Sequence, residues 1–388
     1  MYKHSRTIFN ELLDFIPWKK FEALIGQHRF DRYKKSFSWY NLLLVLMYAQ
    51  ITGKDSLRDI ETSLSVHKNL HYHLWIKSIK RTTIAYNNKT CPHEIFENVF
   101  YELLKQVQWF YQNKRFNFYS LDSTTISTSL NLIPRAKHRT TKWAVKMHVL
   151  LNNQNLVPDV IEITNGKKAD ITIGKIMNLE TKLEKGSFII FDRWYVDYER
   201  YKTLDDNWLF FVTRAKRNMD YLVIKSKNIG INWVQRDEIV EVFNPYGKPY
   251  QWNLRLIHYI SPEDGREYQF LTNNFEVNPK IIALLYKNRR QVELFFKFIK
   301  QNLKIKSFLW TSKNAVRNQL WVAMIYYLIV CYIKFKTKVK QGLLELCRLL
   351  SESLLLRLKI IDILGLTPQY LKKISNFSRY WPVQESLF

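Results

Sequence analysis

Cysteine is scarce in this sequence of 388 residues, and none of its three cysteines lies in a C-x-x-C pair. The sequence therefore lacks the pattern of a disulfide scaffold or of a zinc finger. Glycine and proline are also few, at 10 residues each. Collagen-like and wholly disordered classes are excluded, because 47% apolar residues, with 15% aromatic residues, can fill real hydrophobic cores.

Long hydrophobic runs are missing as well. The best candidate, residues 320–333, is shorter than the ~20 residues that a membrane-spanning helix needs, and Lys334 and Lys336 follow it directly. We expect a buried core helix here and no membrane partner. The N-terminus shows neither a continuous apolar stretch nor a small-residue cleavage site, so the sequence predicts a cytoplasmic protein.

Acidic residues are in short supply. The chain has 60 Lys and Arg residues against 34 Asp and Glu residues, and the resulting net charge of +26 is spread over all its parts. A surface this positive repels itself unless it meets a polyanion. Because no run is long enough to span a membrane, nucleic acid rather than an anionic membrane is the expected partner.

Hydrophobic periodicity divides the chain into three expected domains. Residues 1–112 have apolar positions at helical spacing, and Ser56, with Asp59 three positions later, is typical of a helix start. Residues 113–330 alternate like strands, with a helical crossover at 170–185, and include a β-rich insertion at about 206–275. Residues 331–388 are helical again. The expected strands lie at 116–125, 145–151, 157–164, 187–192, 208–216, 221–226, 238–243, 253–260 and 267–273.

Two aspartates follow predicted strands of this α/β domain, which is expected to hold a mixed sheet with helices. Asp122 ends the first strand and Asp192 ends the fourth, and a carboxylate at a strand end projects into the crevice where such sheets bind ligands. Two carboxylates held close need a cation, and oxygen ligands favour Mg²⁺ or Mn²⁺. Taken singly, each aspartate is equally typical of a helix N-cap or a turn.

A third carboxylate lies in a predicted helix over residues 286–300. At ~100° per residue its polar side chains share one face and its apolar side chains the other. The alternative is an ordinary solvated face with ion pairs four residues apart. The polar face comprises Tyr286, Arg289, Glu293, Lys297 and Lys300.

The spacing Tyr286-x2-Arg289-x3-Glu293-x6-Lys300 resembles the Y-R-E-K signature of bacterial insertion-sequence transposases of the DDE class, in the group named after insertion sequence four. Neighbouring segments agree with this resemblance, which covers nearly the whole chain. These segments are SLRDIETSL at 56–64, LDSTT at 121–125, FDRWYVDY at 191–198, FVTRAKRN at 211–218, LTNNFE at 271–276 and FFKFIKQNLKIKSFLWTS at 295–312.

The resemblance implies an RNase H-like core in which Asp122, Asp192 and Glu293 bind two Mg²⁺ or Mn²⁺ ions. The implied function is a DNA transposase that binds terminal inverted repeats, cleaves the DNA ends and joins them to target DNA, with a hairpin intermediate between these steps in some relatives. A homodimer in a synaptic complex and association with the bacterial nucleoid are implied as well. Tyr286, Arg289 and Lys300 would contact DNA phosphates.

Further DNA contacts are expected at less specific positions. The family commonly has a glycine where this chain has Trp194, whose ring would either stack on an unpaired base or pack in the local core. At each of the other positions the side chain either contacts a DNA phosphate or is an ordinary solvated basic residue. These positions are Arg193, Lys146, Arg214, Lys216, Lys304 and Lys306. The helical domain, with a basic cluster at 28–35, would read the repeats, and residues 331–388 would support dimerisation.

Two other functions remain open at this point. An inactivated or domesticated relative would bind DNA without turnover, and a structure-specific nuclease of the same fold would cut DNA but never join it. The intact set of three carboxylates favours the transposase, and a strand-transfer assay discriminates it from the nuclease.

Overall fold

The computed structural model describes residues 6–28, 37–67, 79–109, 117–127, 144–165, 177–195, 197–231, 233–243, 248–303, 312–367 and 369–370. Contacts divide the chain into two compact units. The helical unit comprises Met1–Gln112, Thr128–Lys142 and Phe298–Phe388, and the sheet unit comprises Asn113–Ser127 and Trp143–Lys297. The predicted break after residue 330 falls inside a helix of the helical unit, because the C-terminal helices pack with the N-terminal ones.

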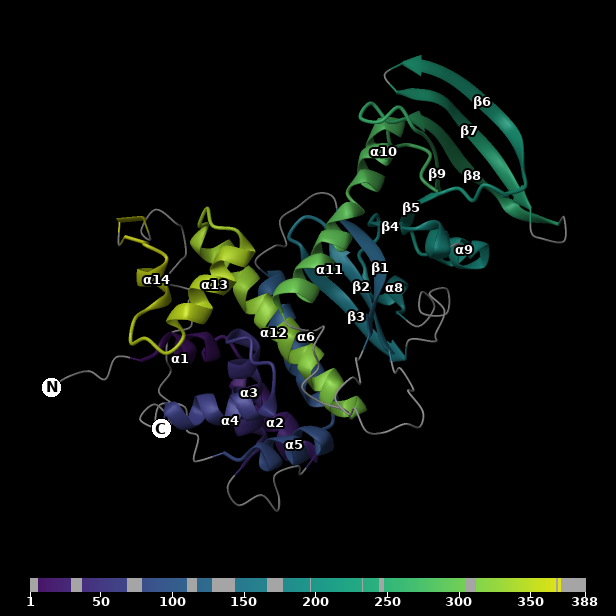
Figure 1. The fold of residues 1–388 in the computed structure, drawn as a ribbon. Helices are drawn as coiled ribbons and strands as arrows, with labels where there is room; N and C mark the ends of the chain where they lie inside the picture. The colour runs from purple at the N-terminus through teal and green to yellow at the C-terminus, as the bar shows by residue number, and fades with distance from the viewer. Residues whose placement is uncertain are drawn as a thin grey trace, which may run out of the picture. The chain divides into compact units, whose positions relative to one another are not determined.

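Short helices build the helical unit, as the periodicity predicted. The Ser56 hydroxyl accepts a hydrogen bond from the Asp59 backbone N–H at 3.0 Å, which confirms the predicted helix start. The helices are α1 (Ile8–Leu13), α2 (Trp18–His28), α3 (Trp39–Ile51), α4 (Leu57–Val66), α5 (Arg81–Thr90), α6 (Glu94–Trp109), α12 (Lys313–Thr337), α13 (Leu343–Ser353) and α14 (Ile360–Ile363) (Figure 1).

Helix α12 is the core of this unit. It is long and apolar enough to cross a membrane, but 89% of its most apolar window is buried inside the protein, against α3, α5, α6 and α13. The Trp321 ring packs 5.3 Å from that of Phe100, and the Asn318 amide donates a hydrogen bond to the Asn88 side chain at 2.9 Å. The prediction of a buried core helix is confirmed, although the helix is longer than the apolar run alone indicated.

Nine described strands form one sheet in the order β3-β2-β1-β4-β5-β9-β8-β7-β6. Strand β4 pairs parallel with β1 and with β5, and the other neighbours pair antiparallel. The strands are β1 (Phe118–Ser127), β2 (Ala144–Asn152), β3 (Val157–Asn165), β4 (Phe188–Phe191), β5 (Phe210–Arg214), β6 (Tyr221–Ile231), β7 (Val234–Phe243), β8 (Pro249–Ile260) and β9 (Glu267–Thr272). In Figure 1 strands β6–β8 form a long curved ribbon.

The mixed core sheet is β3-β2-β1-β4-β5, and β6–β9 extend it as the β-rich insertion. Strand β5 was expected inside the insertion, but its parallel pairing with β4 places it in the core. Of the predicted crossover at 170–185, the structure describes only α8 (Leu179–Lys182) as helix, and residues 170–176 lie outside the described residues. Helix α9 (Tyr198–Asp206) connects β4 to β5.

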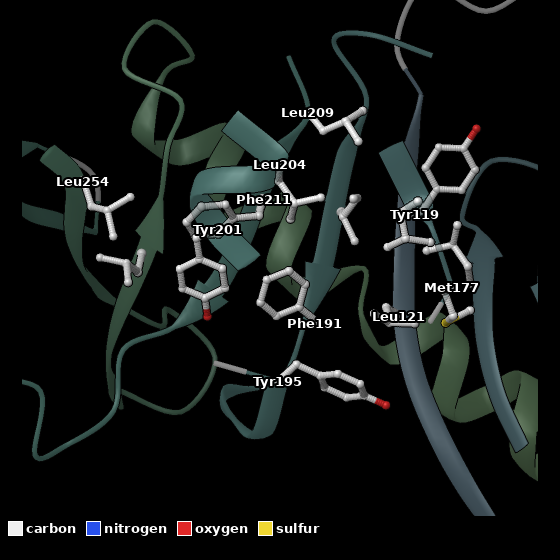
Figure 2. Packing of buried hydrophobic residues seen from close by; sticks show 14 of the residues in the cluster. Tyr119, Leu121, Met177, Phe191, Tyr195, Tyr201, Leu204, Leu209, Phe211 and Leu254 are labelled. Carbon is white, nitrogen blue, oxygen red and sulfur yellow. The ribbon is translucent and has the colours of Figure 1, made fainter. Parts of the chain in front are cut away.

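Alternation along the strands gives the sheet two buried faces. Ile189 and Phe191 of β4 belong to one cluster, where Phe191 stacks near Phe211 and Tyr201 (Figure 2). Phe188 and Ile190 point to the other face, into a cluster completed by helix α10 (Pro279–Lys287). Because successive side chains alternate, a strand that is apolar throughout is covered on both sides. Helix α10 is thereby fixed on the sheet that carries the two aspartates.

Candidate active site

The two aspartates stand side by side on neighbouring parallel strands. The last registered pair of β1 and β4 is Leu121 with Phe191, and Asp122 and Asp192 are the next residues of their chains. Each carboxylate accepts a 2.7 Å hydrogen bond from the backbone N–H of the residue that follows it. Asp122 does not end its strand as predicted, because β1 continues to Ser127 along β2 while β4 stops. The sheet thus splits at the aspartates.

Glu293 comes from the first turn of helix α11 (Arg290–Asn302). The predicted single helix over 286–300 is wrong, because α10 ends at Lys287 and Asn288 and Arg289 lie between the two helices. The Asn288 backbone N–H closes α10, and the Arg289 backbone N–H donates to the Tyr286 carbonyl at 3.0 Å. As a result Tyr286 is buried in the cluster under α10, at 6% exposure, while the Glu293 side chain is half exposed.

The Arg289 guanidinium joins two of the three carboxylates. It lies 3.2 Å from the Asp122 carboxylate and forms a closer ion pair with Glu293. The pair with Glu293 is the four-residue pairing expected of a solvated helix face. The contact with Asp122 is not, because it spans 167 residues of sequence and the Arg289 side chain is only 15% exposed.

The surroundings of Asp122 and Arg289 shift the pKa values of both side chains. Burial raises the pKa of Asp122, and the Glu293 and Asp192 charges add to this, whereas the Ser123 N–H and Arg289 oppose it. Burial acts to lower the pKa of Arg289, but the neighbouring Tyr286, Glu293 and Asp122 outweigh it and the pKa is raised. Carboxylates that are held close together and whose charged form is disfavoured are typical of a cation-binding site.

The three carboxylates fit a divalent ion by donor type, since all are oxygen ligands. In the part of the chain that the structure describes, no three His, Cys, Asp or Glu side chains stand close enough to hold one ion as they are placed. Arg289 binds two of the expected ligands instead. Asp122 and Asp192 follow a registered pair of neighbouring strands, and the half-exposed Glu293 side chain is held by Arg289.

A cavity of about 430 Å³ opens next to Glu293 and Arg289. Arg214 from the end of β5 lines it, with its guanidinium 4.8 Å from the Tyr268 ring centroid and 5.2 Å from that of Tyr286. The buried Nε of Arg214 has no hydrogen-bond partner among the described residues. A guanidinium held between two aromatic rings, with a donor unused, is suited to an anionic ligand.

The other predicted contact residues are less closely tied to the carboxylates. Lys146 is paired with Thr125 in the β1–β2 register, and Arg193 begins the short helix η2 (Arg193–Tyr195) after Asp192. Lys216 follows β5, and Lys300 lies on α11 seven residues after Glu293. Trp194 is in η2, but its side chain lies outside the described residues, as do Lys304 and Lys306.

Sequence reasoning missed the residues that fix the start of α10. Asn274, Arg255 and Asp237 form a hydrogen-bonded group there, and only Asn274 falls in a segment that the sequence had singled out, LTNNFE at 271–276. The signal was two consecutive asparagines between a strand and a proline-initiated helix, which is typical of a side-chain-stabilised turn.

Comparisons with known proteins agree with this geometry. The family described as "Transposase DDE domain" matches residues 114–329, and a domain of unknown function matches residues 4–77. A Sinorhizobium fredii protein named as a transposase is 34% identical over 54% of this chain and 59% of its own length. A Geobacillus stearothermophilus protein named as the transposase of element IS5377 is 29% identical over 56% of this chain and 57% of its own length.

A more distant relative covers more of the chain. A Synechocystis protein named as the transposase of element IS4SA is 24% identical over 71% of this chain and 78% of its own length. The cryo-EM structure of a piggyBac transposase synaptic complex with hairpin DNA shares 13% identity at a TM-score of 0.44, over 98% of this chain and 85% of that one. The chain thus spans under two thirds of the length of the two relatives at 34% and 29% identity.

Proposed function

Because this chain belongs to the transposase DDE-domain family, whose match covers more than half of it, we propose that it is the DNA transposase of an insertion sequence. It binds terminal inverted repeats, cleaves the DNA ends and joins them to target DNA. The observation that carries the proposal is the meeting of Asp122 and Asp192 at the split in the sheet, with Glu293 tied to Asp122 through Arg289.

Asp122, Asp192 and Glu293 hold the divalent metal on which this family depends. Two bound Mg²⁺ or Mn²⁺ ions would stabilise the attacking and the leaving oxygen of a phosphodiester. In cleavage, the oxygen of water bonds to phosphorus and loses its proton, while the bond to the DNA 3′-oxygen breaks. In joining, that 3′-hydroxyl attacks a target phosphodiester in the same way. The carboxylates would orient the ions, and the strand register beside Asp122 and Asp192 would keep these two ligands in place through both steps.

Cationic side chains around the carboxylates hold the DNA backbone. Arg289 and Arg214 offer guanidinium forks on the cavity side, and Lys300 adds a point charge farther along α11. Tyr286 is among the residues that line the same cavity, its ring lies against Arg214, and its hydroxyl would donate to a phosphate. Further DNA contacts in the proposal are Arg193, Trp194, Lys146, Lys216, Lys304 and Lys306.

The remaining parts of the chain have supporting roles in the proposal. Residues 1–112 read the terminal repeats, and residues 331–388 help two copies pair in a synaptic complex. The net charge of +26 supports a protein that stays on DNA, here the bacterial nucleoid. Binding by charge alone gives a steep salt dependence, so affinity for a random duplex should fall strongly as salt rises.

A cleavage assay tests the proposal. Purified protein is given a labelled duplex that bears the terminal repeat of its own element, with Mg²⁺, with Mn²⁺ and with EDTA. Metal-dependent nicking at the repeat boundary, followed by joining to a plasmid target, supports the transposase. Nicking without joining identifies a structure-specific nuclease. Tight binding without nicking under all conditions identifies a catalytically silent DNA-binding protein.

A further inference from the structure

The turn between β9 and α10 is fixed almost entirely by side chains. The Asn274 carboxamide oxygen accepts from the backbone N–H groups of Glu276 and Val277, at 3.1 and 2.8 Å. The Asn278 side chain then caps α10 by accepting from the Lys280 N–H at 3.0 Å. Asn274 itself is 4% exposed, so its two hydrogen bonds are partly shielded from water, whereas the Asn278 cap is exposed. A turn held in this way has one conformation rather than many.

Arg255 of β8 clamps the same turn from the insertion. Its Nη1 donates to the carbonyls of Asn274 and Val277, at 3.1 and 2.6 Å. Its Nε and Nη2 donate to the two Asp237 carboxylate oxygens of β7, at 2.8 and 2.6 Å. The guanidinium is therefore a fork between a carboxylate and two backbone carbonyls, and Arg255 is only 6% exposed.

The clamp holds the start of α10, the helix that leads to the proposed catalytic glutamate. From the turn, α10 runs across the sheet with Ile282, Leu285 and Tyr286 buried against it, and α11 begins after two residues. A shift at the start of α10 therefore passes to Arg289 and Glu293 with few bonds to absorb it. Asp122 and Asp192 are held by the strand register and would not follow.

We propose that Arg255, seated on Asp237, is a positioning residue through which the β-rich insertion sets Glu293 against the two aspartates. The proposal rests on the proposed function, because it assigns a role in the same carboxylate site. It also gives the insertion a purpose in the reaction: β7 and β8 supply the support for the one metal ligand that does not come from the core strands. Misplacement of such a ligand by about 1 Å is enough to reduce turnover strongly.

We expect the insertion to keep its fold when this clamp is removed. Arg255 is paired in the ladder with Thr272 of β9 and with Ile239 of β7, and those backbone bonds do not depend on its side chain. Arg255→Lys keeps a cation beside Asp237, but an ammonium group cannot reproduce the planar fork to both carbonyls. Arg236→Lys is the matched control, because Arg236 is on β7, pairs with Glu238 at 3.3 Å and has a side chain that is 53% exposed.

The experiment compares wild type, Arg255→Lys and Arg236→Lys as full-length proteins below their unfolding temperatures. For Arg255→Lys we expect at least a tenfold lower kcat for cleavage, a KM for DNA within twofold of wild type, and at least fivefold weaker Mn²⁺ binding without DNA. Amide hydrogen exchange at 274–293 should increase in Arg255→Lys alone. Unchanged exchange and Mn²⁺ affinity would overturn the proposal, and so would a loss explained fully by a smaller folded fraction.

A second pair of variants changes Asn274, the turn residue whose carbonyl accepts a hydrogen bond from Arg255. Asn274→Ala removes the acceptor for two backbone N–H groups and should reproduce the Arg255→Lys changes, whereas Asn274→Asp keeps that acceptor and should restore exchange and Mn²⁺ affinity. Equal behaviour of these two variants would overturn the proposal. Failure of wild type to cleave DNA would instead refute the proposed function, and hydrogen exchange would still decide whether the clamp positions α10 and α11.

Discussion

Removing the Arg289 guanidinium should tighten divalent metal binding to the DNA-free protein while it abolishes efficient cleavage. Arg289 contacts Asp122 and Glu293, two of the three proposed ligands, so it competes with a metal ion for the same oxygens. In Arg289→Ala the carboxylates lose their internal counter-ion, and an incoming divalent ion no longer meets a positive charge beside its site. Cleavage still falls, because the variant also lacks a guanidinium for the DNA phosphate.

The size of the effect follows from charge and distance. Two unit charges 4 Å apart interact by about 1 kcal/mol in water and by about 4 kcal/mol at the effective dielectric near a protein surface. A divalent ion doubles the repulsion, so even the aqueous limit gives about 2 kcal/mol, or roughly 30-fold in dissociation constant. The aqueous limit is appropriate because the Glu293 side chain is 50% exposed. We therefore expect at least tenfold tighter binding.

Calorimetric titration with Mn²⁺ in the absence of DNA measures this directly. Arg290→Ala is the control, because Arg290 is the next residue, lines the same cavity, is exposed and carries the same charge. It should change Mn²⁺ affinity by less than threefold. An Arg289→Ala protein that binds Mn²⁺ no better than wild type would refute the idea that this guanidinium occupies the place of the metal.

Three further predictions concern single residues. Glu293→Gln should abolish nicking while DNA affinity in a mobility-shift assay stays within about twofold, because a metal ligand and not a phosphate contact is lost; persistent nicking would show that the triad is wrongly assigned. Lys300→Ala should weaken end binding and cleavage together, by about threefold or more, whereas Lys297→Ala should not, and equal behaviour would make Lys300 a plain surface charge. Burial lowers the pKa of Lys336 to about 8, so between pH 8 and its ordinary value of 10.5 the unfolded chain binds the extra proton. Wild-type stability, measured by urea unfolding against Lys336→Met, should therefore rise with pH across that window, and a constant difference would contradict the shift.

The sequence predicted the strands of the sheet well, because the alternation of apolar and polar residues along a strand is a local pattern. The same reasoning expected a strand over 116–125 and yet placed Asp122 at its end. Strand β1 continues nonetheless, because β2 pairs with it as far as Ser127 after β4 has ended. This pairing on one side depends on tertiary structure, which local sequence does not encode. It leaves Asp122 next to the end of β4.

The single helix predicted over 286–300 failed for a related reason. Its helical spacing is unbroken in the sequence, and the only local stop signal is Asn288. Packing decides the break, because Tyr286 is drawn into the apolar cluster under α10 while Glu293 points to solvent. Long-range partners such as Arg289 with Asp122, or Arg255 with Asp237, have no signature in spacing at all, so the sequence could suggest a triad but not the groups that contact it.

The Arg289 guanidinium would also link the binding of metal to the binding of DNA in this chain of net charge +26. Three carboxylates near one another would repel in the free protein, and Arg289 relieves this by joining two of them. On the proposed function, if a divalent ion took those oxygens, the guanidinium would be left at the cavity that Arg214 also lines, where the two cations would attract a phosphate. That phosphate would neutralise Arg289 and so favour the metal-bound arrangement. Metal and DNA would then stabilise each other through one side chain, which a lysine, with a single point of attachment, could not do as well.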